Sequence, residues 1–152
     1  MIRENSAGGT FMDDAHRELL EQVDPERLYK TVYGLQGVKH PVAAPDALNR
    51  CADRLAEIMR SIGLTVREQV FYIEGWDAPF RNIEGSIGDV TSQPAAVITA
   101  HYDTVATSWG ANDDASGLAV MLENARLIAA LPSPPPVYFV AVTLEESSNP
   151  LI

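Results

Sequence analysis

The clearest pattern in the chain is a stripe of apolar residues at spacings of three and four over residues 46–62. Such a stripe predicts an α-helix that buries one face. Asp46 is suited to cap the first turn of this helix, and Gly63 to occupy the left-handed position that ends it. Other helices are predicted over residues 13–23, from the Asp24-Pro25 start to Gly37, and over residues 117–131.

Short apolar runs predict the strands. Residues 95–100 and 137–142 are continuous apolar runs, as expected of strands covered on both faces. A predicted helix and a proline-rich break lie between them, so this part of the chain is expected to form a right-handed βαβ crossover in an α/β domain. Two further strands, over residues 65–73 and 81–87, are expected to pair as a hairpin.

Composition and charge limit the class of protein. The chain has 152 residues, enough to bury the core of one domain, and residues 1–23 are expected to form a polar leader and a short helix before it. The formal net charge is −10 and the pI is near 4.6, so nucleic acids and anionic membranes are not expected as partners. No apolar run suits a secretory signal or a membrane span, so a cytoplasmic protein is expected.

Cys51 is the single cysteine of the chain. One cysteine excludes an intrachain disulfide and a thiolate metal site. Because Cys51 falls on the apolar side of a predicted helix, it is expected to be a buried structural thiol.

Three clusters of potential metal-binding residues flank the predicted βαβ unit. In an open α/β sheet, ligands gather beyond the carboxyl ends of the strands. One cluster follows the first apolar strand, one lies in the loop before the crossover helix, and one follows the second apolar strand. The clusters are His101-Tyr102-Asp103, residues 110–117 with Asp113 and Asp114, and Glu145-Glu146.

The chemical types in these clusters fit a metal centre. Imidazole nitrogen and carboxylate oxygen without sulfur suit catalytic zinc, manganese or cobalt. A carboxylate can bridge two ions about 3.5–4 Å apart, as in two-metal hydrolases. Asp103, two residues after His101, can accept the second ring N–H, and one of the two glutamates can deprotonate a bound water.

The two glutamates impose a geometric condition. Successive residues of an extended strand point to opposite faces, so Glu145 and Glu146 cannot both reach one site while the strand continues. The strand is therefore predicted to end near Thr143 and Leu144.

Together, the three clusters resemble metallopeptidase family 28, the co-catalytic di-zinc aminopeptidases, which also contains glutaminyl-cyclase relatives. The family pattern is His-x-Asp, then Gly-Ala-x-Asp-Asp-x-Ser-Gly, then Glu-Glu after a strand, and it occurs here in order. The helix over residues 46–62 and the Arg81-Asn82 pair also resemble the family, so the likeness covers residues 24–146. A related dipeptidase and deacylase family usually has one Asp followed by Gly in its middle motif, which fits less well.

The resemblance implies a fold and site roles. The fold is a three-layer sandwich with a central mixed, largely parallel sheet flanked by helices. The site holds two zinc ions, or manganese or cobalt. The implied roles are one zinc ligand (His101), the bridging ligand (Asp113), a ligand to the other zinc (Glu146), the general base (Glu145), the residue that orients the histidine (Asp103) and a supporting residue (Asp114).

The resemblance also implies that coordination is incomplete. In the family, each zinc takes one further ligand, an Asp or a His, from sequence beyond the Glu pair, and residues 147–152 contain neither. Residues 24–152 are therefore expected to be the N-terminal part of a zinc peptidase domain, inactive alone, with a peptide substrate and with a missing C-terminal half or self-association as possible completion. The alternatives are a non-catalytic binding domain derived from the peptidase and a glutaminyl-cyclase-like acyltransferase.

The remaining histidines and the two tryptophans have less specific predictions. His16 and His40 are expected to be surface or loop residues rather than ligands. Trp76 and Trp109 are candidates for a substrate entrance or for simple packing or exposure, and Trp109 is the better candidate because it precedes the loop over residues 110–117.

Overall fold

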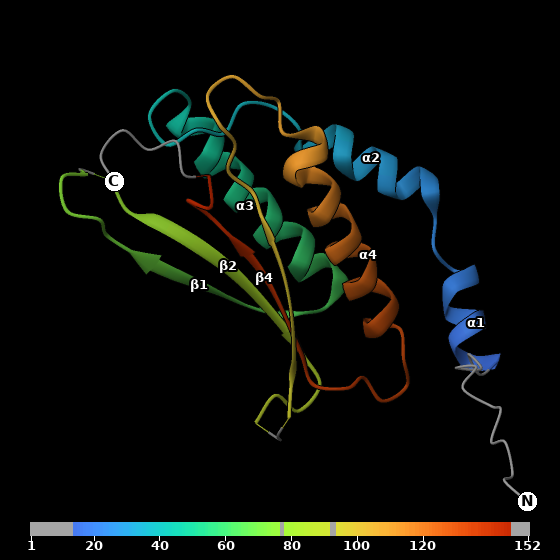
Figure 1. Ribbon diagram of the computed structural model, residues 1–152. Coiled ribbons are helices and arrows are strands. Elements are labelled where there is room, and N and C mark those ends of the chain that lie inside the picture. The colour runs from blue at the N-terminus through green and yellow to red at the C-terminus, as the bar shows by residue number, and fades with distance from the viewer. Residues whose placement is uncertain (1–13, 77, 92–93, 147–152) are drawn as a thin grey trace, which may run out of the picture.

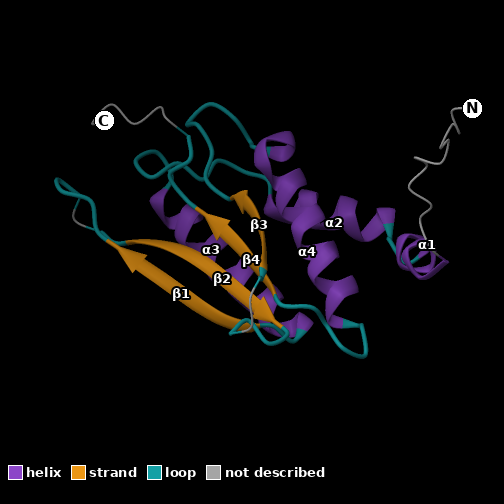
Figure 2. Cartoon of the chain, turned by 60° about the horizontal axis from the view of Figure 1, so that its bottom comes forward, coloured by secondary structure: helices purple, strands orange, loops and turns teal. Residues whose placement is uncertain are grey.

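Four strands form one sheet in the order β1-β2-β4-β3, and the helices lie over one of its faces (Figures 1 and 2). The computed structural model describes residues 14–76, 78–91 and 94–146. In chain order the elements are α1 (Asp14–Glu21), α2 (Pro25–Leu35), α3 (Pro45–Ile62), β1 (Thr65–Phe71), β2 (Phe80–Ile87), β3 (Ala96–His101), the short helical turn η1 (Ala111–Ala115), α4 (Ser116–Ala129) and β4 (Val137–Val142).

The mixed sheet with flanking helices is confirmed. The β1–β2 and β2–β4 pairings are antiparallel, and the parallel part is the β3–β4 pairing, which α4 connects as the predicted crossover helix. β3 ends one residue later than predicted, because His101 still pairs with Val142 and the ladder continues to the bond from Tyr102 N to Val142 O. His101 is therefore the last residue of a strand rather than the first residue after it.

The core lies between the sheet and α3 and α4. α3 packs on β1 and β2, and α4 packs on β3 and β4. The runs that form β3 and β4 predict strands covered on both faces, but in the described part of the chain helices cover one face alone, so Val97 is 60% exposed. The largest fully buried apolar side chains are those of Leu55, Met59, Ile83, Leu118, Met121 and Phe139.

Local signals set the helix ends, with one correction. Asp24 caps α2 as predicted, since its Oδ1 accepts the N–H groups of the first turn, and Gly63 ends α3 with φ of 99°. The prediction that Asp46 caps α3 is wrong. α3 begins at Pro45, whose fixed φ suits the first helical position, so the cap is Ala44 and Asp46 lies inside the first turn.

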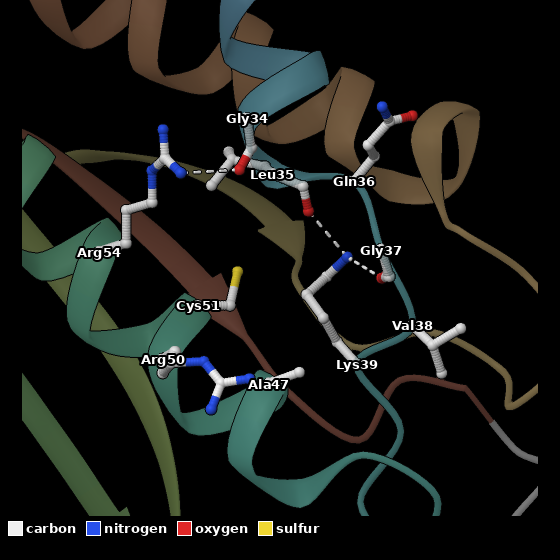
Figure 3. A pocket seen from close by; sticks show the side chains of 10 residues that line it. All are labelled: Gly34, Leu35, Gln36, Gly37, Val38, Lys39, Ala47, Arg50, Cys51 and Arg54. Atoms are coloured by element: carbon white, nitrogen blue, oxygen red, sulfur yellow. Dashed lines mark hydrogen bonds between the residues drawn. The ribbon is translucent and has the colours of Figure 1, made fainter.

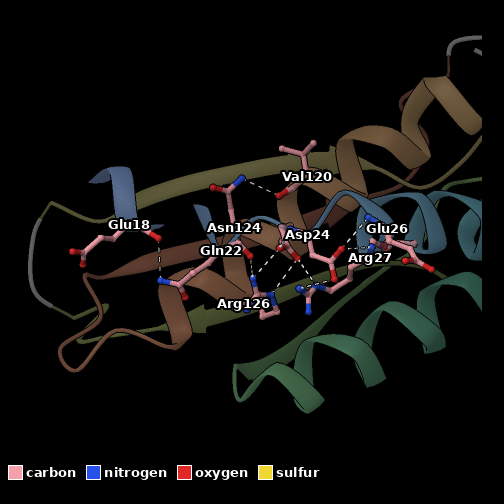
Figure 4. Close-up of polar contacts among 10 residues, drawn as sticks. Glu18, Gln22, Asp24, Glu26, Arg27, Val120, Asn124 and Arg126 are labelled. Carbon is pink, nitrogen blue, oxygen red and sulfur yellow. Dashed lines mark hydrogen bonds and ion pairs between the residues drawn. The ribbon is translucent and has the colours of Figure 1, made fainter. Parts of the chain in front are cut away.

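Glu123 of α4 joins the start of α2 to the rest of the fold. Its side chain is 6% exposed, and its carboxylate accepts hydrogen bonds from Asp24 N at 3.2 Å, from Arg27 Nε at 2.9 Å and from Arg126 Nη2 at 2.9 Å. Arg126 also donates to the carbonyl of Gln22, and Figure 4 shows Gln22, Asp24, Arg27 and Arg126 gathered at this junction. The hydrogen bond from Arg126 is the main reason that the pKa of Glu123 lies below its ordinary value.

Some expectations fall on parts of the chain that are not described. The predicted leader over residues 1–12, the end of the chain over residues 147–152 and the side chain of His16 lie outside the described residues. Among the described helices, none combines the length and apolarity that crossing a bilayer requires.

We predict that Glu123→Gln destabilises the fold, because Gln keeps the size of Glu123 but removes the carboxylate that Arg27 and Arg126 share, and Arg27 then keeps only Asp24 as an ion-pair partner. Losing charge-assisted hydrogen bonds at a largely buried acid is expected to lower the free energy of unfolding by about 1–3 kcal/mol. Urea unfolding followed by circular dichroism measures this. The control Lys30→Gln breaks the exposed Glu26–Lys30 pair and should change stability by less than about 0.5 kcal/mol. Equal losses in the two variants would contradict the role of Glu123.

Candidate metal centre

The structure brings together the three residues predicted to bind metal. His101 ends β3, Asp113 lies in η1 before α4, and Glu146 follows β4. Each offers one ligand atom, and these atoms all lie within 4.8 Å of one another. They meet because β3 and β4 are parallel neighbours, so their carboxyl ends and the loop into α4 share one edge of the sheet.

His101 is the enclosed member of the group. Its side chain is 10% exposed, whereas those of Asp113 and Glu145 are 72% and 60% exposed. His101 Nε2 lies 3.0 Å from Asp113 Oδ1 and 3.8 Å from Glu145 Oε2. A fixed imidazole therefore faces carboxylates that remain open to solvent and to an incoming ligand.

Asp103 lies behind the imidazole and is almost completely buried. Its Oδ1 is 3.5 Å from His101 Nδ1, at the outer limit of a hydrogen bond, and Nδ1 is buried with no closer partner. Nδ1 thus faces Asp103, and Nε2, 3.0 Å from Asp113 Oδ1, is the ring nitrogen on the side of the other candidate ligands. The same carboxylate accepts the backbone N–H groups of Glu145 at 3.3 Å and Glu146 at 3.1 Å, a second task that sequence reasoning missed.

The chain turns sharply between β4 and the two glutamates. β4 ends at Val142 and Leu144 has φ of 62°, so the predicted end of the strand near Thr143 and Leu144 is confirmed. A left-handed conformation is uncommon for a residue other than glycine and recurs at functional sites. At the same point Thr143 N donates to Asn82 Oδ1 at 3.1 Å, so a side chain of β2 replaces the next backbone partner of β4.

Asp114 fixes the loop rather than lining the site. Its Oδ2 accepts the N–H of His101 at 3.3 Å, and its Oδ1 accepts the N–H of Gly117 at 2.9 Å. A Cβ atom at Gly117 would collide with this carboxylate, so the start of α4 requires glycine there. The Asp113–Asp114 peptide bond is cis. These contacts agree with the supporting role that the sequence analysis gave Asp114.

The sequence profile described as peptidase family M28 matches residues 82–149, the part of the chain that contains all of these residues. By this match, and by relatives named aminopeptidase and zinc metalloprotease, the chain is similar to peptidase family M28.

Three relatives are similar to parts of this chain. The uncharacterized protein YfbL of Escherichia coli is 37% identical over 132 residues, which are 80% of this chain and 40% of that protein. Aminopeptidase YwaD of Bacillus subtilis is 51% identical over 49 residues, 32% of this chain and 11% of its own length. A probable zinc metalloprotease of Pyricularia oryzae is 29% identical over 153 residues, 84% of this chain and 30% of its own length. The chain thus spans less than half of each of these relatives.

Solved structures share the fold. A glutaminyl cyclase from Porphyromonas gingivalis has a TM-score of 0.67 and 30% identity, covering 78% of this chain and 44% of the cyclase. A leucine aminopeptidase precursor from Bacteroides thetaiotaomicron has a TM-score of 0.68 and 24% identity, covering 81% of this chain and 48% of its own. The second likeness shows the fold alone.

The electrostatics of this candidate site favour a cation. Burial lowers the pKa of His101, but the hydrogen bond to Asp113 and the charges of Asp103, Asp114 and Glu145 outweigh it, so the pKa is raised. Burial and then the charge of Asp113 raise the pKa of Glu146. Carboxylates crowded around one imidazole repel one another, and a divalent ion relieves that repulsion.

His40 and Trp76 lie outside the candidate metal site. His40 lies in a loop, one of the two positions predicted for it, and it is buried there. Its Nδ1 accepts the N–H groups of Val42 and Ala43 at 3.1 Å. Trp76 packs edge-on against Phe80, with ring centroids 5.1 Å apart.

Trp109 and Cys51 lie at positions that agree with the sequence predictions. Trp109 is 67% exposed next to the metal loop, and its place at a substrate entrance stays a prediction. Cys51 is buried as predicted, and burial raises the pKa of its thiol to about 11.

We predict that Asp103→Asn loosens the turn that carries the glutamates. Asn replaces one acceptor oxygen with an NH₂ group, which would face a backbone N–H of Glu145 or Glu146 and leave it unpaired. The free energy of unfolding should fall by about 1–3 kcal/mol. Urea unfolding measures the loss, and hydrogen exchange at the amides of Glu145 and Glu146 should accelerate. Asp53→Asn, which removes an exposed partner of Arg81, is the control and should cost less than about 1 kcal/mol. Unchanged exchange at both amides would contradict the prediction.

Proposed function

We propose that this chain carries the zinc-binding part of an M28 aminopeptidase, with His101, Asp113 and Glu146 as ligands and Glu145 as general base. The observation that carries the proposal is the convergence of three donors within 4.8 Å at one strand edge, with Glu145 beside them. The relatives named aminopeptidase and zinc metalloprotease support the reaction class.

The donor set fits zinc. Catalytic zinc takes three nitrogen or oxygen ligands from the protein and keeps one position for water, at distances of about 2.0–2.2 Å. One imidazole and two carboxylates, with ligand atoms within 4.8 Å of one another, could hold one ion after small side-chain rotations, whereas the family pattern would assign His101 and Glu146 to different ions with Asp113 shared between them. Asp113, whose side chain is open to solvent, is placed to bridge to a second ion, which needs ligands beyond the described residues.

The residues of the chain divide the work of peptide hydrolysis. When bound, zinc supplies Lewis-acid polarisation of the scissile carbonyl and lowers the pKa of a water ligand. Glu145, which is exposed and lies 3.8 Å from His101 Nε2, takes the proton of the attacking water and passes it to the leaving amine. Asp103 keeps the His101 ring in the orientation in which Nε2 faces the ion and holds the turn that presents Glu145.

A second candidate function rests on a specific likeness. The glutaminyl cyclase from Porphyromonas gingivalis is 30% identical to this chain, and its fold superposes with a TM-score of 0.67. A cyclase would use the same zinc ligands, with Glu145 moving protons while an N-terminal glutamine closes on itself and releases ammonia. A non-catalytic binding domain that keeps the zinc ligands is the remaining alternative.

We predict zinc binding that depends on Glu146 and on pH. Glu146→Gln should weaken zinc binding at least about tenfold, measured by competition with a chromophoric chelator. Because zinc requires neutral His101 and the pKa of this residue is raised above 6.5, protons compete with zinc at low pH, and affinity should rise as pH increases through that range. Glu84→Gln, which removes the partner of Arg67 on the outer face of the sheet, is the matched control and should not change zinc affinity. Equal affinity in the two variants would refute the metal centre.

We predict that Glu145 controls turnover but not zinc binding. Activity is measured for the chain alone and for a chimera. In the chimera, Glu146 is followed by the part of the Escherichia coli relative that lies beyond its matched region. We expect no turnover by the chain alone, and zinc-dependent release of the first residue from leucyl peptides by the chimera. Glu145→Gln should lower kcat at least about 100-fold and leave zinc affinity unchanged.

The same assays separate the three functions. Ammonia release from glutaminyl peptides, without cleavage of leucyl peptides, would favour the cyclase. A chimera that folds and binds zinc but shows neither activity would favour the non-catalytic domain.

A further inference from the structure

A pocket lies between the end of α2 and the first turns of α3, apart from the metal centre. It has a volume of about 360 Å³. Figure 3 shows Lys39 from the loop after α2 and Arg50, Cys51 and Arg54 from α3 around the same space. None of the proposed zinc ligands lines this pocket.

The pocket is basic in an acidic protein. Three cationic side chains line it, those of Lys39, Arg50 and Arg54, and no carboxylate does. The thiol of Cys51 adds no negative charge, because burial raises its pKa to about 11. The whole chain has a net charge of −10, so the positive charge of the pocket is opposite in sign to the net charge of the protein.

Local structure explains part of this charge. Lys39 Nζ is buried and donates to the carbonyls of Leu35 at 2.9 Å and Gly37 at 2.8 Å, and Arg54 Nη1 donates to the carbonyl of Gly34 at 2.9 Å. These bonds satisfy carbonyls at the C-terminal end of α2.

Most donors remain after this capping. An ammonium group has three N–H donors and a guanidinium has five, so Lys39 keeps one and Arg54 keeps most of its set. Arg50 makes no ion pair with any of the described residues, and capping of α2 does not explain its position.

We propose that this pocket binds a small oxyanion, the phosphate or carboxylate group of a soluble ligand. The planar fork of Arg50 suits two oxygens of such a group, and the free N–H of Lys39 suits a third. A volume of about 360 Å³ is within the range of small-molecule sites.

The occupant would lie next to the metal loop. Gly37 N donates to the carbonyl of Trp109 at 2.7 Å, and Lys39 N donates to Thr104 Oγ1 at 2.9 Å. Segment 37–39 therefore has the oxyanion pocket on one side and the residues that flank Asp103 and Gly110 on the other.

Titration of the full chain with inorganic phosphate and, separately, with succinate at constant ionic strength tests the proposal. We expect at least one probe to bind with a Kd of about 1 mM or lower by calorimetry, and to shift the amide resonances of Gly34 and Gly37. Arg50→Ala should weaken binding about tenfold. Arg60→Ala removes the same charge from the same helix, where Arg60 only loosely contacts Glu68 at 3.5 Å, and should bind like the wild type.

The outcomes separate the ligand sources and can overturn the site. Tighter binding of phosphate assigns the pocket to phosphorylated ligands, and tighter binding of succinate assigns it to carboxylates. The proposal is overturned if neither probe saturates, if Arg60→Ala weakens binding as much as Arg50→Ala, or if the shifted amides lie away from Gly34 and Gly37. Because the amide shifts are read in the wild type, the test stands even if Arg50→Ala does not fold.

Discussion

The candidate metal centre depends on one buried carboxylate, that of Asp103. It faces His101 Nδ1 at the end of β3 and accepts two backbone N–H groups after β4, so one side chain links the ends of two parallel strands. The left-handed residue Leu144 turns the chain out of β4 so that Glu145 and Glu146 reach the same edge. Without this link, the loop after β4 alone would hold the two glutamates, and their distances from the imidazole of β3 would follow the motion of that loop.

The chain accommodates clustered acids in two different ways. Glu123 is neutralised within the protein, because Arg27 and Arg126 both donate to it and join α2 to α4. At the metal centre no arginine is present among the described neighbours, and the acids face one another and an imidazole whose pKa they raise. The first arrangement is complete without a ligand and stabilises the fold, whereas the second favours the arrival of a cation.

Positive charge is separated from this acidic edge by a short segment of chain. Segment 37–39 bonds through its backbone to Trp109 and Thr104 on the side of the metal loop, while Lys39 Nζ contributes to the basic pocket. The proposed cation site and the basic pocket thus both adjoin segment 37–39. This arrangement gives the two sites a physical connection through main-chain hydrogen bonds.

Local patterns in the amino-acid sequence specify the helices, the strands and the types of ligand, because these features depend on residues that are close together in the chain. Spacing located α3, Gly63 its end and Asp24 the start of α2, and the alternation of strand residues required β4 to end before Leu144. Motif order identified the likeness to the M28 family and the residues that converge. Tertiary structure decided the rest. The burial of His40, the bonds from Asp103 to the Glu turn, the contact of Asn82 with Thr143 and the basic pocket join residues that are distant in sequence or depend on how loops pack, and no local pattern encodes them.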